Sequence, residues 1–232
     1  MVKTGGLTNI GKVRKVNEDC FYVSENFALV SDGMGGHNKG EVASGLLVKA
    51  LSESLKGNIT KDEVIKAVSD ANSIVINRSK ESPDFEGMGA TLVFACWNDY
   101  DVLIGNVGDS RCYHITHSDI VQVTKDHSLV QRMIDNGQLT EEEAKNSDKK
   151  HIIYRAMGTN EDETPDVFEL KVNKNDVLLL CSDGLSNMIE NREIMEIVKN
   201  ENDPDVISEK LVKKANEKGG TDNITVVAVM FN

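Results

Sequence analysis

Four aspartates in this sequence lie where short apolar runs begin or end. Asp32 in ALVSDG, Asp109 in GNVGDSR and Asp183 in LLLCSDGL close such runs. Asp222 in GGTDNITVV opens one. Taken singly, each is explained by the frequency of aspartate in turns. Because strand ends of an antiparallel sandwich can meet at one rim, the four together predict a shared cluster of carboxylates.

A second acidic element, RKVNEDC, places Arg14, Glu18 and Asp19 directly before the apolar run at 20–23. Carboxylates crowded on one rim repel each other unless cations lie among them. Oxygen ligands of this kind favour Mg²⁺ or Mn²⁺ over zinc. Gly33 has no side chain, so its backbone carbonyl could also approach a metal ion closely. The sequence therefore predicts a metal centre with oxygen ligands.

Such a centre supports displacement at phosphorus. Two metal ions roughly 3.5–4 Å apart lower the pKa of a bound water and hold it in line with a phosphate. Arg14 would bind that phosphate, since a guanidinium pairs with phosphate oxygens in bidentate fashion. The alternative for Arg14 is a surface ion pair with Glu18 or Asp19.

The elements that must position these residues come in groups of strands and pairs of helices. Apolar runs rich in β-branched residues predict strands at 20–23, 27–30, 91–97, 102–108, 112–115, 120–123, 167–172, 177–181 and 224–231. Apolar residues on one face, together with a capping-box signature in TKDE at 60–63, predict helices at 39–55, 61–80, 190–199 and 204–217. This grouping favours antiparallel sheets with helices packed outside them.

Two connecting segments stand out. NDYD at 98–101 separates two of the expected strands and predicts a hairpin turn. The polar segment at 126–163 contains DNGQLTEEEAKNSDKK, and short helices are predicted within it at 128–135 and 140–146. Long surface insertions between strands are often functional.

Composition restricts the classes of function. The 232 residues suit one domain with a substantial core, and the net charge of −12 disfavours nucleic-acid binding. The four cysteines form no CxxC pair, which indicates buried free thiols in a reducing compartment. We find no signal-peptide pattern, and the apolar run at 224–231 is too short to span a bilayer. A cytoplasmic location is expected, although the chain could have been cut from a larger membrane protein.

Five motifs then point to one family. RKVNED, SDGMGGH, GDSR, SDGL and GGTDNITVV occur in the order and rough spacing of the metal-dependent serine/threonine protein phosphatases of the protein phosphatase 2C (PPM) family, and the sequence most resembles its bacterial members. The resemblance implies an α+β fold: a four-layer α/β/β/α sandwich of two antiparallel sheets flanked by helix pairs. It also implies a single catalytic domain over 1–232, with the family's flap at about 126–163.

The resemblance assigns roles to the acidic motifs. Two core Mn²⁺ or Mg²⁺ ions would be held by Asp32, the Gly33 carbonyl, Asp183 and Asp222, with Asp32 bridging them. Asp109, with Asp183, would hold a possible third ion. Glu18 and Asp19 would act mostly through metal-bound waters, Arg14 would bind the substrate phosphate, and Asn223 would support the rim.

The sequence departs from the family pattern in two places. Animal members place a histidine directly after the first Asp-Gly, where this chain has Met34. His37 lies three residues further on and is the candidate catalytic acid, because a serine alkoxide needs a proton to leave. A metal-bound water, with His37 only bracing the loop, is the alternative. In NSDKKHIIYRAMG, phosphate recognition by Lys149, Lys150 or His151 is a hypothesis.

The function these motifs imply is hydrolysis of phosphoserine and phosphothreonine in proteins by an activated water, without a phosphoenzyme. The expected partners are phosphoprotein substrates and a eukaryote-like Ser/Thr kinase, and we expect a monomer that binds no nucleic acid or membrane. One alternative is an inactive binding module with the same fold. Another is a hydrolase for small phosphoesters or nucleotides, although GMGGH lacks the ending of a P-loop.

Overall fold

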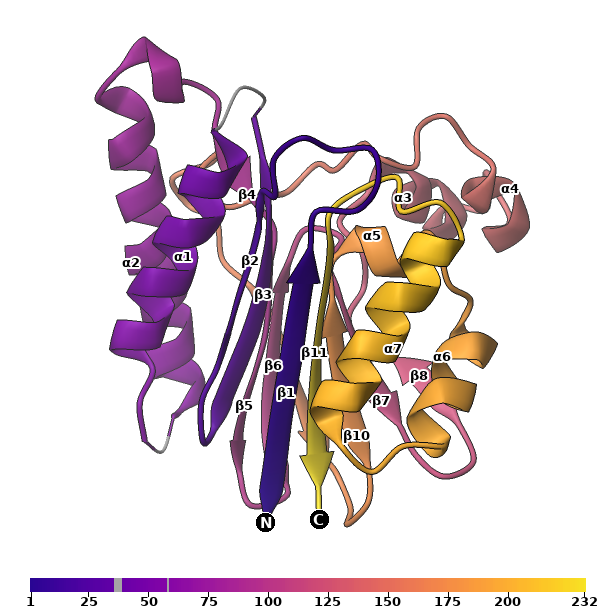
Figure 1. The fold of residues 1–232 in the computed structure, drawn as a ribbon. Helices are drawn as coiled ribbons and strands as arrows, with labels where there is room; N and C mark the ends of the chain where they lie inside the picture. The colour runs from indigo at the N-terminus through magenta and orange to yellow at the C-terminus, as the bar shows by residue number, and fades with distance from the viewer. Residues whose placement is uncertain (36–38, 58) are drawn as a thin grey trace.

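The computed structural model describes residues 1–35, 39–57 and 59–232. Figure 1 shows strands stacked as two sheets in the middle, with one group of helices on either side. The two termini lie next to each other at the same end, because the first and last strands pair with Val2 opposite Phe231. The expected α/β/β/α sandwich is confirmed.

The first sheet has five strands in the order β1-β11-β10-β7-β8. They are β1 (Val2–Asn9), β11 (Ile224–Phe231), β10 (Val177–Cys181), β7 (Arg111–Ile115) and β8 (Ile120–Gln122). All neighbouring pairs are antiparallel. The first residues of β11 therefore lie near the last residues of β10.

The second sheet follows the order β2-β3-β5-β6-β9, with a short β4 paired to β3. Its strands are β2 (Asp19–Val23), β3 (Phe27–Met34), β4 (Gly89–Ala90), β5 (Leu92–Asn98), β6 (Asp101–Val107) and β9 (Asp166–Lys171). These pairs are antiparallel as well. The hairpin between β5 and β6 turns at Asp99, whose φ is +53°, which confirms the turn predicted at 98–101.

Helices cover the outer face of each sheet (Figure 1). The second sheet is covered by α1 (Gly40–Ser54) and α2 (Lys61–Lys80), followed by a short 3₁₀ turn at Pro83–Phe85. The first sheet is covered by α5 (Asp183–Ser186), α6 (Asn191–Lys199) and α7 (Pro204–Glu217). Thr60 caps α2 through the predicted capping box with Glu63.

Three apolar layers result from this arrangement. The layer between the sheets consists of inward-facing strand residues such as Val30, Val93, Ile104, Leu180 and Val227, all without solvent exposure. The other two layers lie between each sheet and its helices. Full burial of a large aliphatic or aromatic side chain contributes about 1.5–3 kcal/mol. The strands, and the residues at their ends, are therefore fixed from both faces.

Two strands, β1 and the two-residue β4, were not expected from the sequence. β1 has a weak apolar alternation and two adjacent glycines, yet all of its residues pair with β11. Gly5 allows α7 to pack directly on this strand, since a Cβ there would lie 2.4 Å from the backbone nitrogen of Asp205. The short helix α5 was not expected either.

The polar segment 126–163, called the flap segment below, connects β8 to β9 and so passes from one sheet to the other. It contains α3 (Leu129–Asp135) and α4 (Glu141–Lys145), close to the ranges predicted for its two short helices.

Two further observations concern the whole chain. Cys96, Cys112 and Cys181 are buried and Cys20 is partly buried, and all four thiols are free. Within residues 1–35, 39–57 and 59–232, no helix combines the length and apolar character needed to cross a bilayer.

Candidate active site

The rim that the sequence predicts is formed where strands of both sheets end. Asp32, near the end of β3, lies opposite Asp19 at the start of β2. Asp109 follows β6, Asp183 follows β10, and Asp222 precedes β11. Burial raises the pKa of Asp32 well above its usual range. The negative charges of the other four carboxylates raise it further, so all four lie near Asp32. Five carboxylates from five separate segments thus share one site.

Asp32 is held by a buried threonine that the sequence analysis did not identify. The backbone N–H of Asp32 donates to Thr91 Oγ1 at 3.0 Å, and the backbone N–H of Thr91 donates to the Asp32 carbonyl at 2.8 Å. Thr91 Oγ1 also lies 2.7 Å from Ser110 Oγ, next to Asp109. One hydroxyl therefore supports the segments that carry both Asp32 and Asp109.

Asp19 links the two sheets. Its Oδ2 accepts hydrogen bonds from Ser182 Oγ at 2.8 Å and from Thr225 Oγ1 at 2.6 Å, both on the opposite sheet or at its edge. Its Oδ1 is buried without any hydrogen-bond partner. Burial raises the pKa of Asp19 to about 7, although the two hydroxyl donors act in the opposite direction. A buried carboxylate oxygen without a partner is costly unless a cation or donor completes it.

Asp183 also has a buried oxygen without a partner, and its charge acts on Asp109. Asp183 Oδ2 accepts from Asn187 Nδ2 at 2.9 Å, but its Oδ1 is buried without a partner. Burial, and then the nearby charge of Asp183, raises the pKa of Asp109 to about 8. These groups fit a bound cation, because positive charge among them would relieve both the repulsion and the unpaired oxygens.

The described part of the chain contains no group of three or more His, Cys, Asp or Glu side chains arranged as a ready-made metal site. The predicted ligand set also includes a backbone carbonyl, that of Gly33. Around Gly33 the backbone is packed closely: a Cβ there would lie 2.1 Å from the Gly40 carbonyl oxygen and 2.6 Å from that of Glu18. Only glycine fits at this point of the rim.

Arg14 lies at the edge of the rim, and its side chain is 48% exposed. Its Nη2 donates to Asp222 Oδ2 at 2.7 Å. The alternative expected from the sequence, a pair with Glu18 or Asp19, is wrong, because the partner is Asp222. The exposed guanidinium lies beside the carboxylates, where a phosphate would need a counter-charge.

Asn223 holds the loop that carries Arg14 and Glu18. Its Oδ1 accepts from the backbone N–H of Glu18 at 2.8 Å, and its Nδ2 donates to the carbonyls of Ile10 and Val16, each at 3.0 Å. The side chain is buried. This agrees with the supporting role that the resemblance implies.

His37, the candidate catalytic acid, lies outside the described residues. Met34, which occupies the position of the animal histidine, is the last residue of β3 and is partly buried.

The flap segment reaches the rim through His151. Its Nδ1 lies 3.9 Å from Asp183 Oδ2, and the contact raises the pKa of His151. His151 and Lys150 also line a hollow of about 350 Å³ within the flap segment, together with Lys145, Asn146, Ser147 and Asp148. Basic side chains therefore gather beside a carboxylate of the rim.

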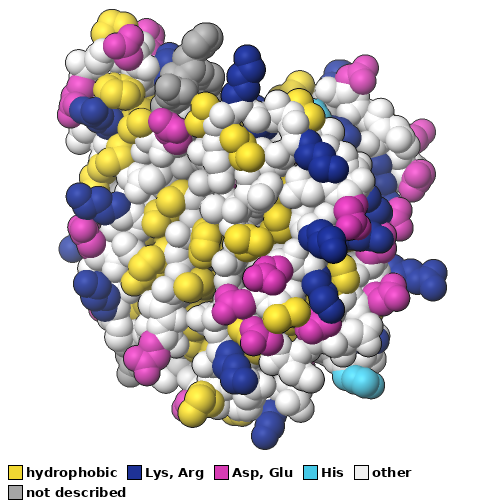
Figure 2. Space-filling view, viewed as in Figure 1, with side chains coloured by type: hydrophobic (Ala, Val, Ile, Leu, Met, Phe, Trp, Pro, Cys, Tyr) yellow, Lys and Arg dark blue, Asp and Glu magenta, His cyan; other side chains and the backbone are white. Residues whose placement is uncertain are grey.

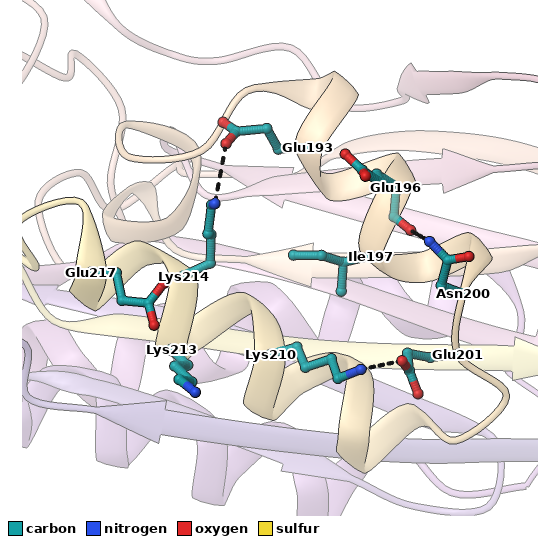
Figure 3. A pocket seen from close by; sticks show the side chains of 9 residues that line it. All are labelled: Glu193, Glu196, Ile197, Asn200, Glu201, Lys210, Lys213, Lys214 and Glu217. Carbon is teal, nitrogen blue, oxygen red and sulfur yellow. Dashed lines mark hydrogen bonds and ion pairs between the residues drawn. The ribbon is translucent and has the colours of Figure 1, made fainter.

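A second hollow, of about 380 Å³, lies between α6 and α7 and contains none of the rim carboxylates (Figure 3). Its charges pair among themselves: Lys214 Nζ lies 3.8 Å from Glu193 Oε1, and Lys210 pairs with Glu201. Figure 2 shows the same mixture of charges on that side of the molecule, whereas hydrophobic side chains gather between the two helix groups. We assign no chemistry to this hollow.

Several residues that shape the site could not be found from the sequence. Thr91, Ser182 and Thr225 are ordinary polar residues in apolar runs, and only pairing between distant strands turns their hydroxyls toward the aspartates. The signal available in the sequence was a polar residue inside a buried strand, which requires a hydrogen-bond partner.

Comparisons with known proteins identify the family. A family model described as protein phosphatase 2C matches residues 15–212. The chain is 38% identical over 234 residues to the serine/threonine phosphatase stp of Listeria monocytogenes serotype 4b (strain F2365), covering 96% of this chain and 93% of that protein.

Solved structures give the same result. The crystal structure of the Mycobacterium tuberculosis serine/threonine phosphatase PstP/Ppp superposes with a TM-score of 0.95 at 32% identity, over 100% of this chain and 99% of the other. The catalytic domain of PstP in complex with two manganese ions superposes with a TM-score of 0.90 at 33% identity, over 99% and 97% of the two chains. From the motifs, the rim and these similarities together, the chain belongs to the protein phosphatase 2C family and is a metal-dependent serine/threonine phosphatase.

Proposed function

We propose that the rim carboxylates hold two Mn²⁺ or Mg²⁺ ions for hydrolysis of phosphoserine and phosphothreonine in proteins. The ligands would be Asp32, the Gly33 carbonyl, Asp183 and Asp222. The observation that carries this proposal is the meeting of five carboxylates at one rim, with buried oxygens of Asp19 and Asp183 that have no partner. When bound, the ions would lower the pKa of a water and neutralise phosphate charge.

The chain's own groups would bind and orient the substrate. Arg14 would bind phosphate oxygens through its exposed guanidinium, exchanging part of its contact with Asp222. Asn223 would keep the loop of Arg14 and Glu18 in place. Asp19, tied to Ser182 and Thr225, would keep the two sheets in register at the site and act through waters.

A third ion is proposed at Asp109 with Asp183, because the nearby charge of Asp183 raises the pKa of the buried Asp109 and a cation there would offset it. His37 as the proton donor to the leaving serine oxygen stays a prediction, with a metal-bound water as the alternative. We further propose that residues 1–232 act as one catalytic domain with a flap at 126–163. A Ser/Thr kinase as partner, a monomeric state and a cytoplasmic location stay predictions.

The deciding experiment is hydrolysis of p-nitrophenyl phosphate and of a phosphothreonine peptide, with EDTA, Mg²⁺ or Mn²⁺. An Asp32→Ala variant of equal thermal stability is the control. We expect turnover that needs Mn²⁺ or Mg²⁺ and is lost in the control. A folded chain without turnover under any of these conditions would contradict the proposal and favour the binding module.

A further inference from the structure

His127 is a buried histidine that the proposed chemistry does not use. It lies at the start of the flap segment and is 3% exposed. Its backbone N–H donates to the Gly108 carbonyl at 2.9 Å, and its Nδ1 accepts from the Gly108 N–H at 3.0 Å. His127 therefore binds both the backbone carbonyl and the backbone N–H of Gly108, the residue before Asp109.

The carbonyl and the second ring nitrogen of His127 contact residues near the end of the flap segment and at the start of β9. Its carbonyl accepts from the Tyr154 N–H at 2.9 Å. Its Nε2 lies 3.2 Å from Asp166 Oδ2 and 2.9 Å from Arg155 Nη1, which also donates to Asp166 Oδ1 at 2.7 Å. Arg155 is held in turn by Glu163 at 2.9 Å. His127 thus joins both ends of the flap segment to the turn of Asp109.

The hydrogen bonds define the state of the ring. Because Nδ1 accepts from a backbone N–H, it carries no proton, so the neutral ring has its proton on Nε2 and donates it to Asp166. Arg155 Nη1 then donates to Asp166 Oδ1 and not to the ring nitrogen. Burial lowers the pKa of His127 and outweighs the contact with Asp166, which raises it; the lowered pKa agrees with a neutral ring. A neutral ring can accept from Gly108 and donate to Asp166 at the same time.

The turn of Asp109 depends on these contacts. Gly108 has a φ of +103°, and a Cβ there would lie 2.7 Å from Thr91 Cγ2. On its other side Ser110 contacts Thr91, which supports Asp32. Asn106 adds one hydrogen bond to the Gly108 carbonyl at 3.2 Å. His127 therefore connects the flap segment to this turn through Gly108, beside the ion pair of Asp126 with Arg111.

We propose that His127 is a positioning residue that fixes the Asp109 carboxylate and couples it to the base of the flap segment. The inference rests on the proposed function, because Asp109 matters for turnover only if it belongs to the metal site. Supporting residues of this kind typically change metal affinity or activity by about 10–100-fold.

Two conservative variants separate the two halves of the role. His127→Asn keeps an acceptor near the position of Nδ1 and loses the link to Asp166. His127→Gln places its amide near the position of Nε2 and loses the acceptor for Gly108. His114→Ala is the matched control, because His114 Nε2 contacts Asp176 Oδ2 at 2.8 Å in a similar pair that involves none of the rim residues.

Three quantities would be measured for each variant: hydrogen exchange of the Gly108 amide, Mn²⁺ affinity by calorimetry, and kcat and KM for p-nitrophenyl phosphate. We expect His127→Gln to speed Gly108 exchange and to lower Mn²⁺ affinity or kcat by about 10-fold or more. His127→Asn, which keeps the acceptor for Gly108 and loses the link to Asp166, should leave Gly108 exchange near the wild-type rate and lower Mn²⁺ affinity or kcat by a smaller factor. His114→Ala should lower the melting temperature without these changes.

Unchanged Gly108 exchange in His127→Gln would overturn the inference, and so would fast exchange with unchanged Mn²⁺ affinity and kcat. A wild-type chain that turns over no phosphoester would contradict the proposed function instead. In that case Gly108 exchange and Mn²⁺ affinity still decide the role of His127.

Discussion

Asp32 on the rim and His151 on the flap segment serve the same candidate site, yet they are held in different ways. Asp32 is bound through its backbone to the buried Thr91, which lies between β4 and β5. The His151 side chain is 59% exposed, and its contact with the rim is the one to Asp183 at 3.9 Å. The carboxylates are thus fixed by the fold, whereas the part of the flap segment next to His151 has turn contacts such as the one from the Ile152 N–H to the Lys149 carbonyl.

This difference has a physical basis. Opening the rim would break buried hydrogen bonds between strands, whereas moving the flap segment near His151 disturbs turn contacts such as Lys150 N–H to Ser147 at 3.2 Å. Regions with few buried contacts open at low free energy. The part of the flap segment next to His151 is therefore expected to move at a lower free-energy cost than the rim.

The largest effect is expected from loss of a rim carboxylate. Asp183→Ala removes a proposed metal ligand, so turnover of p-nitrophenyl phosphate with Mn²⁺ should fall by at least about 100-fold. Steady-state kinetics measures this, with the melting temperature as a check of folding. Near-normal turnover would show that Asp183 is not a metal ligand. The rim carboxylates would then no longer differ from the flap segment in their importance for turnover.

Support of the rim should matter almost as much. Thr91→Val keeps the shape of the side chain but leaves the Asp32 N–H and Ser110 Oγ without their partner. The free energy of unfolding should fall by about 1–3 kcal/mol, and kcat should fall with it.

The matched control for this variant is Thr124→Val, since Thr124 Oγ1 accepts from the buried Cys112 N–H at 3.0 Å and contacts no rim aspartate. Urea denaturation and kcat would be compared for both variants. Equal loss of stability with an equal loss of kcat in the control would argue against a specific role for Thr91.

Arg14→Ala tests the exposed edge of the rim. Loss of the guanidinium should raise KM for phosphoester substrates by about 10-fold with a smaller change in kcat, because it removes binding energy for the phosphate. Arg14→Lys should restore this only in part, since an ammonium cannot pair in bidentate fashion. Lys15→Ala controls for the loss of one positive charge, and an unchanged KM in Arg14→Ala would identify a surface pair with Asp222.

The smallest effect is expected in the flap segment. Lys150→Ala should raise KM for an acidic phosphopeptide by a few-fold, about 1 kcal/mol or less for an exposed charge, and leave p-nitrophenyl phosphate unaffected. Lys199→Ala, on α6, is the control for net charge. Equal effects on the peptide and on p-nitrophenyl phosphate would mean that the flap segment acts in the common chemistry and not in substrate choice.

Much of the fold could be predicted because local patterns and tertiary structure agree. The helices α1, α2, α6 and α7 and nine of the strand ranges follow from apolar periodicity and capping. β1 could not be predicted, since its residues become a strand only by pairing with β11 at the other end of the chain. Apolar periodicity reports which side chains are buried. It carries little information about a segment such as β1, which becomes a strand through backbone pairing with a distant strand.

For the site, the candidate residues could be identified from the sequence: aspartates at strand ends, the glycine after Asp32 and an arginine before the second acidic motif. The contacts that hold them depend on the tertiary structure. Arg14 pairs with Asp222 across 208 residues, and Asp19 meets Thr225 across 206. The reason is physical: residue type and local spacing determine chemistry and secondary structure, whereas hydrogen-bond partners between distant segments depend on how the sheets pack.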